Sequence, residues 1–407
     1  MKKQFLPILL GSDANVYGMA RSFHEEYGVI SVSVGKKRTA KYIESSESKI
    51  VFSDNCEGIQ NTEVFLKKML EIYRKHHQNY EKLILIPCGD LYARLIIQNQ
   101  KFLSKYFYTS TLSENQRVSL EDKDKFYKTC EKYGLDYPKT MIINFESREN
   151  YVLDIDFPVM LKAADSISYS NINFPGKKKA YKIDNSKQLE IAIYEIYSSE
   201  YRGDLIIQEY IPGDDSYSYV LNTYSNRKGK VKMMSLGHVL LQNPFPTEIG
   251  NYVTIMADHD KAIYEKMKKF LESFGYVGYA NIDMKYDYRD KKYKLFEINV
   301  RQGRSSYYVT GAGLNLSRFI VEDLVLNKDS EPVYNENEWL WHSIPKIVLM
   351  RKINKKWKSK VENLILKMKC GGTIFYKKDM SFKRFLVVMR LKATEYRNFT
   401  KYYKKNK

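Results

Sequence analysis

A polar face on one strand-like segment carries side chains that could bind a metal ion. In residues 294–301, KLFEINVR, polar and apolar residues alternate with the period of a β-strand. Glu297, Asn299 and Arg301 therefore share one face, while the apolar residues between them point into a core. An acid, an amide and a guanidinium are thus displayed together against an apolar backing.

A second segment predicts a partner for this strand. Residues 279–285, YANIDMK, alternate in the same way, and the turn-rich residues 287–290 predict a hairpin that brings Asp283 opposite Glu297. Two carboxylates and an amide oxygen at close quarters repel one another unless a hard cation lies among them, and oxygen ligands suit Mg²⁺. We predict a Mg²⁺ site at Asp283, Glu297 and Asn299. The alternative is an ordinary amphipathic hairpin with its polar face in water.

Two segments upstream carry features of a nucleotide site. Residues 157–162, FPVMLK, form an apolar strand pattern that ends at Lys162 and runs into the serine-rich residues 165–170. A lysine at a strand tip can reach phosphates, although a lone lysine there is more often a surface residue whose stem covers apolar neighbours. Residues 205–211 form a second strand pattern before a Pro-Gly turn. Its backbone could pair with adenine, and Asp215 after the turn could accept from ribose hydroxyls.

Taken in order, these segments resemble the ATP-grasp ligases over residues 110–327. By that resemblance, Asp283, Glu297 and Asn299 are the ligands of Mg²⁺, and Arg301 is a catalytic arginine near the acyl phosphate and the departing phosphate. The positions that the resemblance assigns to ATP are Lys123, Lys162, Ser166, Ser168, Gln208, Glu209, Tyr210, Ile211 and Asp215. The sequence departs from the family in having Asp where Glu is commoner at the ribose position, and in lacking a glycine-rich loop over the phosphates.

Four further motifs narrow the resemblance. Residues 7–13, 15–23, 212–216 and 301–306 resemble the D-aspartate ligases of Gram-positive peptidoglycan synthesis. The resemblance implies that ATP phosphorylates the β-carboxylate of D-aspartate, and that the acyl group passes to the lysine side-chain amine of UDP-MurNAc-pentapeptide. Arg304 is then the second catalytic arginine, placed to hold substrate carboxylates because a guanidinium fork suits bidentate capture. A structural ion pair is the alternative for Arg304.

Two other functions stay open. One is an ATP-grasp ligase that joins a different acid to a different amine. The other, from a different class, is a non-catalytic nucleotide-sensing protein that binds a membrane or a nucleic acid through its basic C-terminal residues. ATP turnover separates a ligase from such a sensor.

The elements that must position these residues alternate along the chain. Strand patterns near 5–10, 30–34 and 83–87 alternate with helix patterns at 16–27 and 62–76, which predicts a small parallel sheet of Rossmann-like outline. The predicted fold class is α/β (α+β), an ATP-grasp fold with an N-terminal Rossmann-like domain and a basic, partly helical C-terminal extension. The predicted units are residues 1–110 for the N-terminal domain, 111–200 for the small ATP-grasp subdomain, 201–327 for the large subdomain with the metal site and 328–407 for the extension. Polar stretches predict a boundary at 109–121 and a linker at 335–338.

The formal net charge of +19 is concentrated near the C-terminus. Residues 340–407 hold 20 Lys and Arg against three acids and supply 17 of these charges, so we expect no nucleic-acid groove in the catalytic body. Three interpretations of this tail stay open: docking on the body with a basic outer face, contact with an anionic membrane surface, or gathering of anionic substrates. No apolar stretch approaches the roughly 20 residues needed to span a bilayer. We expect a cytoplasmic protein, with at most peripheral contact at the inner face of the membrane.

Overall fold

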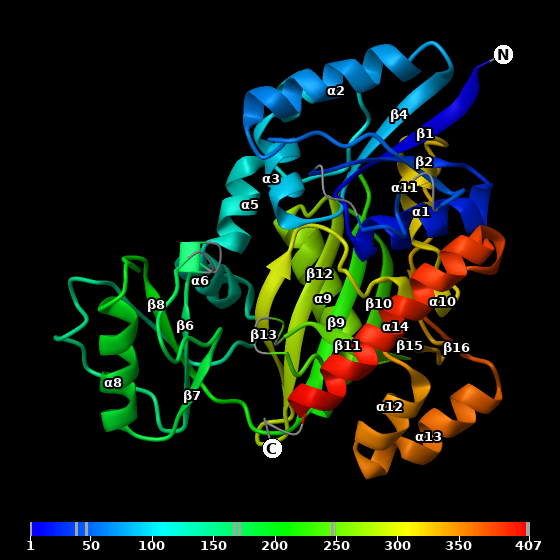
Figure 1. Ribbon diagram of the computed structural model, residues 1–407. Helices are drawn as coiled ribbons and strands as arrows, with labels where there is room; N and C mark the ends of the chain where they lie inside the picture. Colours follow the sequence, from blue (N-terminus) through cyan, green and yellow to red (C-terminus); the bar gives the residue numbers. More distant parts are fainter. Residues whose placement is uncertain are drawn as a thin grey trace.

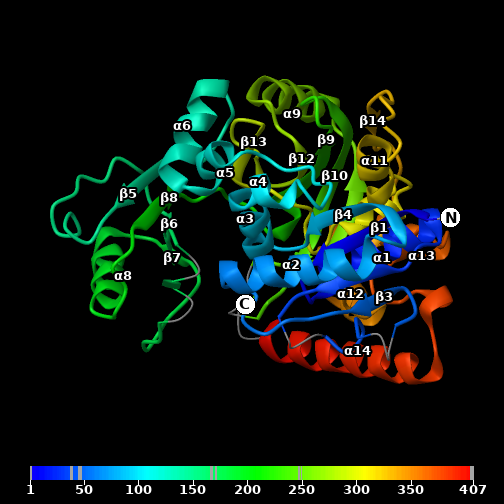
Figure 2. The ribbon, with the colours of Figure 1, turned by 90° about the horizontal axis from the view of Figure 1, so that it is seen from above.

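Three β-sheets organise the chain (Figure 1). The computed structural model describes residues 2–403 except 37–39, 45–47, 166–167, 170–171, 246–247 and 249. The first sheet is formed by the N-terminal residues, the second belongs to a lobe on the left of Figure 1, and the third lies at the centre of the molecule. Figure 2, seen from above, places the lobe clear of the C-terminal helices.

The N-terminal sheet is wholly parallel, as the sequence predicts. Its strands, in the order β3-β2-β1-β4, are β1 (Lys3–Leu10), β2 (Ser31–Val34), β3 (Val51–Ser53) and β4 (Tyr80–Pro87). The helices that accompany it are α1 (Ala14–Tyr27), α2 (Thr62–His76), α3 (Asp90–Gln98) and α4 (Gln100–Leu103). Six consecutive residues of β1 are buried, as expected for a parallel strand covered on both faces. The carboxyl ends of β1 and β4 therefore lie side by side.

Two helices lead into the small lobe. They are α5 (Glu114–Glu121) and α6 (Lys123–Tyr133). The α6 helix ends at Gly134 in the left-handed conformation (φ 64°), which confirms the predicted stop. The polar stretch 109–121, in which the sequence predicts a boundary, contains the first of these two helices. Ser113 and Gln116 form a capping box at its start, and this signal is present in the sequence.

The small lobe is a four-stranded antiparallel sheet with one helix against it. Its strands, in the order β5-β8-β6-β7, are β5 (Thr140–Ile143), β6 (Val159–Ala163), β7 (Tyr181–Ile183) and β8 (Leu205–Glu209). Helix α8 (Ser186–Tyr197) buries Leu189, Ile193 and Ile196 in the core of this lobe. The lobe therefore holds β6 and β8, the two strands on which the sequence predicts nucleotide contacts.

The central sheet is mainly antiparallel and carries the predicted metal hairpin. Its strands from this region, preceded by the short helix η1 (Asp215–Tyr217), are β9 (Ser218–Ser225), β10 (Val231–Gln242), β11 (Tyr252–Asp258), β12 (Gly278–Asp287) and β13 (Lys292–Asn299). The strands β12 and β13 pair so that Asp283 stands directly opposite Glu297, which confirms the predicted hairpin. The register shifts between Asp283 and Met284, so Leu295 is buried and Phe296 is only partly buried. Helix α9 (Lys261–Phe274) covers one face of this sheet, and α1 belongs to the core against the other face.

The C-terminal residues are built into the central sheet. The remaining elements are α10 (Tyr307–Gly311), α11 (Leu316–Leu324), β14 (Val333–Tyr334), β15 (Leu340–His342), α12 (Lys346–Lys352), α13 (Lys355–Leu366), β16 (Cys370–Gly371), η2 (Lys377–Asp379) and α14 (Phe382–Tyr403). The strand β15 pairs with β11, and β16 extends the sheet beyond it. The predicted linker at 335–338 is an irregular segment between β14 and β15, and Asn335 is its buried residue, 1% exposed with its side chain donating to two backbone carbonyls. In the described chain, no helix has the length and hydropathy needed to cross a membrane.

A buried ion pair joins the C-terminal segment to the N-terminal domain. Arg384 Nε lies 3.1 Å from Asp379 Oδ2, and neither side chain is exposed. Asp379 also accepts from Tyr17 Oη at 2.7 Å and from Ser48 Oγ at 2.9 Å, and Arg384 donates to the carbonyl of Tyr42 at 2.5 Å. Because burying a charge is costly unless it is paired and hydrogen-bonded, these contacts hold the two regions in one arrangement.

We expect Asp379→Ala to lower the free energy of unfolding by about 3–5 kcal/mol, because it leaves the Arg384 guanidinium buried without its counterion. Thermal and denaturant unfolding followed by circular dichroism would measure the loss. Asp154→Ala is the control, since its pair with Lys139 is exposed on both sides and is worth less than about 1 kcal/mol. Equal losses in the two variants would contradict a structural role for the buried pair.

Candidate functional site

The three predicted metal ligands lie together on the β12–β13 hairpin. Asn299 Nδ2 donates to Asp283 Oδ2 at 3.2 Å and to Glu297 Oε1 at 3.4 Å. Tyr252 Oη, from β11, which lies three strands away from β12 in the same sheet, donates to Asp283 Oδ1 at 2.9 Å. Two carboxylates and one amide thus share a single cluster. Among the residues described, no set of three or more His, Cys, Asp or Glu side chains is suited to a metal.

The charges around the hairpin shift the pKa values of the two carboxyl groups in opposite directions. Burial, followed by the charge of Glu297, raises the pKa of Asp283 to about 8. Glu297 is 47% exposed to the cleft but is otherwise densely surrounded, and burial acts to raise its pKa. Lys123, Lys162 and Arg301 outweigh that effect and hold the pKa of Glu297 at about 2. The two pKa values are thus shifted in opposite directions, and a divalent cation between the groups would favour ionisation of both.

Two lysines from separate elements converge on this cluster. Lys123, in the first turn of α6, places Nζ 3.5 Å from Glu297 Oε2. Lys162, on β6, donates from Nζ to Gln208 Oε1 at 3.2 Å. Burial, followed by the charge of Lys123, lowers the pKa of Lys162 to about 8. Two cations held close together in a poorly solvated place suit an anion with several charges, such as a polyphosphate.

Gln208 orients Lys162. The side chain is 2% exposed, and Nε2 donates to Tyr127 Oη at 2.9 Å and to Thr140 Oγ1 at 2.8 Å. Its amide oxygen and both of its amide hydrogens are thus used within the protein. These contacts fix the Gln208 side chain beside Lys162, and the expected contact of this segment's backbone with the nucleotide stays a prediction.

The other predicted nucleotide contacts are also tied to protein partners. Glu209 pairs with Arg289, and Lys182 Nζ lies 4.8 Å from the ring centroid of Tyr210. The carbonyl of Ile211 accepts from Lys285 at 2.8 Å, and Asp215 accepts from the backbone amide of Gln242 at 2.9 Å. Ser168 Oγ donates to Asp165 at 2.6 Å. Ser166 lies outside the described residues. None of the described members of this group lines the large cleft beside the metal hairpin.

That cleft has a volume of about 1490 Å³ and is lined by the metal cluster, Arg301 and Arg304. Arg301 Nε lies 2.8 Å from Asp90 Oδ1, and its Nη2 donates to Asn299 Oδ1 at 3.2 Å. Arg304 is exposed and makes no salt bridge with any residue in the described part of the chain. The structural ion pair considered for Arg304 is therefore not found, and the guanidinium remains available to an anionic ligand.

Sequence reasoning missed Asp90, Tyr252 and the C-terminal wall of the cleft. A signal for Asp90 was present, because it follows β4 at the edge where the carboxyl ends of parallel strands meet and ligands commonly bind. Tyr252 and the cleft-facing residues of α14 come close only through long-range packing. No pattern in the sequence brings them to the metal hairpin.

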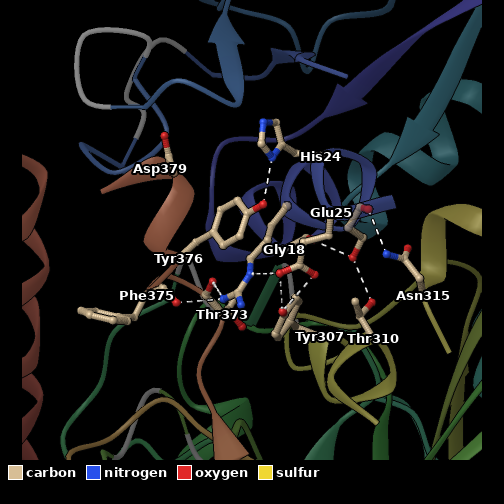
Figure 3. A network of polar contacts seen from close by, with 12 residues as sticks. Gly18, His24, Glu25, Tyr307, Thr310, Asn315, Thr373, Phe375, Tyr376 and Asp379 are labelled. Atoms are coloured by element: carbon tan, nitrogen blue, oxygen red, sulfur yellow. Dashed lines mark hydrogen bonds and ion pairs between the residues drawn. The ribbon is translucent and has the colours of Figure 1, made fainter. Parts of the chain in front are cut away.

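Arg21 ties α1 to the segment that leads into that wall, which includes the labelled residues Thr373 and Phe375 of Figure 3. Its Nη1 donates to the carbonyls of Gly372, Thr373 and Phe375 at 2.8, 2.9 and 3.0 Å, and its Nε pairs with Glu25 at 2.8 Å. Arg21 therefore holds one rim of the cleft with its guanidinium, as a positioning residue.

The sequence of the chain is similar to that of a curated enzyme. It is 42% identical to a D-aspartate ligase from Enterococcus faecium (strain Aus0004), over 98% of this chain and 97% of that one. The chain belongs to the D-aspartate ligase family. No protein-family model matches it.

Solved structures identify the fold of this D-aspartate ligase family member. The L-amino acid ligase from Bacillus licheniformis aligns with a TM-score of 0.53 at 13% identity, over 80% of this chain and 75% of that one. The ADP complex of N5-carboxyaminoimidazole ribonucleotide synthetase aligns with a TM-score of 0.59 at 12% identity, over 84% and 81%. The predicted ATP-grasp fold is confirmed, and with the family membership the chain is an amide-forming ligase.

We expect Lys162→Met to raise the dissociation constant for ATP about tenfold to a hundredfold, because one charged contact with a phosphate is worth about 1.5–3 kcal/mol. Isothermal titration calorimetry with Mg²⁺ and ATP would measure the change. Lys187→Met removes an exposed lysine from the same lobe and is expected to bind ATP as the parent does. Unchanged affinity in the Lys162 variant would exclude a phosphate contact.

Proposed function

We propose that the chain uses ATP and Mg²⁺ to phosphorylate the β-carboxylate of D-aspartate and passes the acyl group to the lysine side-chain amine of UDP-MurNAc-pentapeptide. The observation that carries the ligase part of the proposal is the convergence of Lys123 and Lys162 on the carboxylates of Asp283 and Glu297. The identity of the amino acid is supported by the curated relative, whose name states D-aspartate.

The residues fit the chemistry that such a ligase requires. A carboxylate resists attack by an amine because its leaving group would be oxide, and phosphorylation replaces that leaving group with phosphate. Asp283, Glu297 and Asn299 would hold Mg²⁺, which supplies charge neutralisation to the nucleotide phosphates when it is bound. Lys123 and Lys162 would bind phosphate oxygens from the other side.

Arg301 is suited to the transferring phosphoryl group. Its guanidinium is fixed by Asp90 on one side and Asn299 on the other, so it reaches the cleft without reorganising during the reaction. Arg304 has no such anchors and is free to grip a substrate carboxylate through a two-pronged contact. The two arginines thus take different parts in the proposed reaction.

We expect D-aspartate, and not L-aspartate, to stimulate phosphate release from ATP, with further stimulation by UDP-MurNAc-pentapeptide. Glu297→Gln should lower the rate at least about a hundredfold, because a metal ligand that neutralises phosphate charge is lost. Glu200→Gln, at an exposed position in the small lobe, is the matched control.

Either of two results would count against the proposal. Phosphate release by the Glu297 variant at the parental rate with every acid would remove the metal assignment. Stimulation by L-aspartate alone would remove the D-aspartate assignment and leave the ligase chemistry in place.

A second proposal concerns contact with an anionic membrane surface. Near the start of α14, an exposed patch combines aromatic and aliphatic side chains with lysines: Phe375, Phe382, Phe385, Leu386, Lys377, Lys378 and Lys383. Phe382 is 79% exposed and Leu386 53% exposed, so apolar surface is available for insertion among lipid headgroups. The lysines are suited to attract anionic lipids.

We expect the chain to sediment with vesicles that contain phosphatidylserine and not with vesicles of phosphatidylcholine alone. Substituting Phe382 and Leu386 together with Ser should reduce the bound fraction several-fold, because each side chain buries apolar area in the interface. Substitutions are preferable to truncation because residues 340–342 and 370–371 belong to the central sheet. Equal sedimentation of the parent and the double variant would contradict the proposal.

A further inference from the structure

One face of α14 forms part of the cleft wall opposite the metal hairpin. Figures 1 and 2 show this helix lying across the front of the central sheet as an outer layer. Val388 and Phe399 are 1% and 3% exposed, and both line the cleft together with Lys392 and Glu395. The spacing of these four residues places them on one side of the helix. Two ionisable side chains therefore interrupt an otherwise apolar inner face.

Glu395 has no hydrogen-bond partner for one of its oxygens. Its Oε2 is shielded from solvent and makes no hydrogen bond with any described residue. Lys392, one turn away, donates from Nζ to the carbonyl of Ser343 at 2.6 Å and does not hydrogen-bond to this oxygen. A buried polar atom without a partner is costly and rare in folded proteins, so its presence beside a cleft calls for a ligand.

The charges around Glu395 indicate which sign of charge a ligand of this side chain should carry. Burial raises the pKa of Glu395 to about 7, while Lys392 and Arg304 act to lower it and Glu248 acts to raise it. Tyr42, which also feels the charge of Glu395, is itself deeply buried, and burial raises its pKa above the usual value. A positively charged group donating to Oε2 would replace the lost solvation of the carboxylate.

Arg304 provides the opposite charge in the same cleft. It lines the cleft, lies near enough to Glu395 to influence its titration, and forms no salt bridge with a described residue. A carboxylate and a guanidinium that face a common space without pairing complement a molecule carrying an ammonium and a carboxylate group. Amino acids have this charge arrangement, and so does the lysine-bearing end of a peptide.

We propose that Glu395 binds the ammonium group of an amino substrate in this cleft, which makes the C-terminal helix part of the substrate site. This inference rests on the proposed function. The ammonium has two sources there, the α-ammonium of the aspartate donor or the side-chain ammonium of the acceptor lysine. Both have the same chemistry, a charged nitrogen donor that replaces a missing hydrogen-bond partner.

The test compares acids with and without an amino group. Hydroxylamine traps an acyl phosphate without any acceptor, so trapping with D-aspartate and with succinate reports the donor alone. For Glu395→Gln, we expect the ratio of kcat/KM for D-aspartate to that for succinate to fall at least tenfold if the donor ammonium binds there. We expect an unchanged ratio and a tenfold rise in KM for UDP-MurNAc-pentapeptide if the acceptor ammonium binds instead.

Controls separate binding from folding. Glu362→Gln, at an exposed position on α13, should match the parent in both measurements. Glu395→Asp keeps the charge and should recover part of whichever property is lost. Each ratio compares two substrates of one variant, so a reduced amount of folded protein cancels.

The same variants give a pH profile as an independent measurement. The carboxylate must be ionised to attract an ammonium, so kcat/KM for the affected substrate should fall as the pH decreases through about 7 in the parent. This acid limb should be absent from Glu395→Gln. Lys392, Arg304, Glu248 and Tyr42 remain in place in both proteins, so a change in the limb reports Glu395.

The inference is overturned if Glu395→Gln equals Glu362→Gln in the substrate ratio and in KM for the acceptor. That result is distinct from failure of the proposed function, in which the parent itself forms no hydroxamate from D-aspartate.

Discussion

Two carboxylates held opposite each other on adjacent strands constrain the rest of the site. The register of β12 and β13 places Asp283 and Glu297 face to face, and side chains at directly opposed positions lie within about 5.5 Å at Cβ. Their repulsion must be offset by positive charge, and the protein brings it from three places: α6, β6 and the end of β13. These groups form a cluster of cations and acids whose charges only partly compensate one another. In the proposed function, a metal ion and a polyphosphate complete this cluster.

The cations around this pair differ in how firmly they are held. Arg301 is fixed by Asp90 and Asn299, and Lys162 is oriented by Gln208. Arg304 has no comparable anchor among the described residues. Rigid groups suit the part of a reaction where charge develops, and a freer group suits recognition of a substrate that must enter and leave. The cleft thus changes from a preorganised end at the hairpin to an adaptable end near α14.

Much of this arrangement could be predicted from local patterns. The period-2 alternation of residues 279–285 and 294–301 was sufficient for the hairpin and for the pairing of Asp283 with Glu297. It did not predict the register shift that follows Asp283, which buries Leu295 and leaves Phe296 partly exposed. The apolar strand that ends near Lys162 could likewise be predicted from the sequence. Asp90, Tyr252 and Glu395 could not be assigned in this way, since each reaches the cleft through contacts between distant segments. The side-chain contacts of Gln208 could not be predicted either, because its partners Tyr127 and Thr140 come from other elements.

The basic C-terminal segment has a structural part and an exposed part. Arg384 is wholly buried with Asp379, and the Lys392 ammonium donates to a backbone carbonyl, so both charges have a structural role. Lys377, Lys378 and Lys383 face outward beside exposed aromatic residues. One segment therefore contributes strands to the central sheet, a wall to the cleft and a charged outer surface. Because the wall and the sheet strands share this segment, the cleft is complete only when the C-terminal residues have folded onto the body.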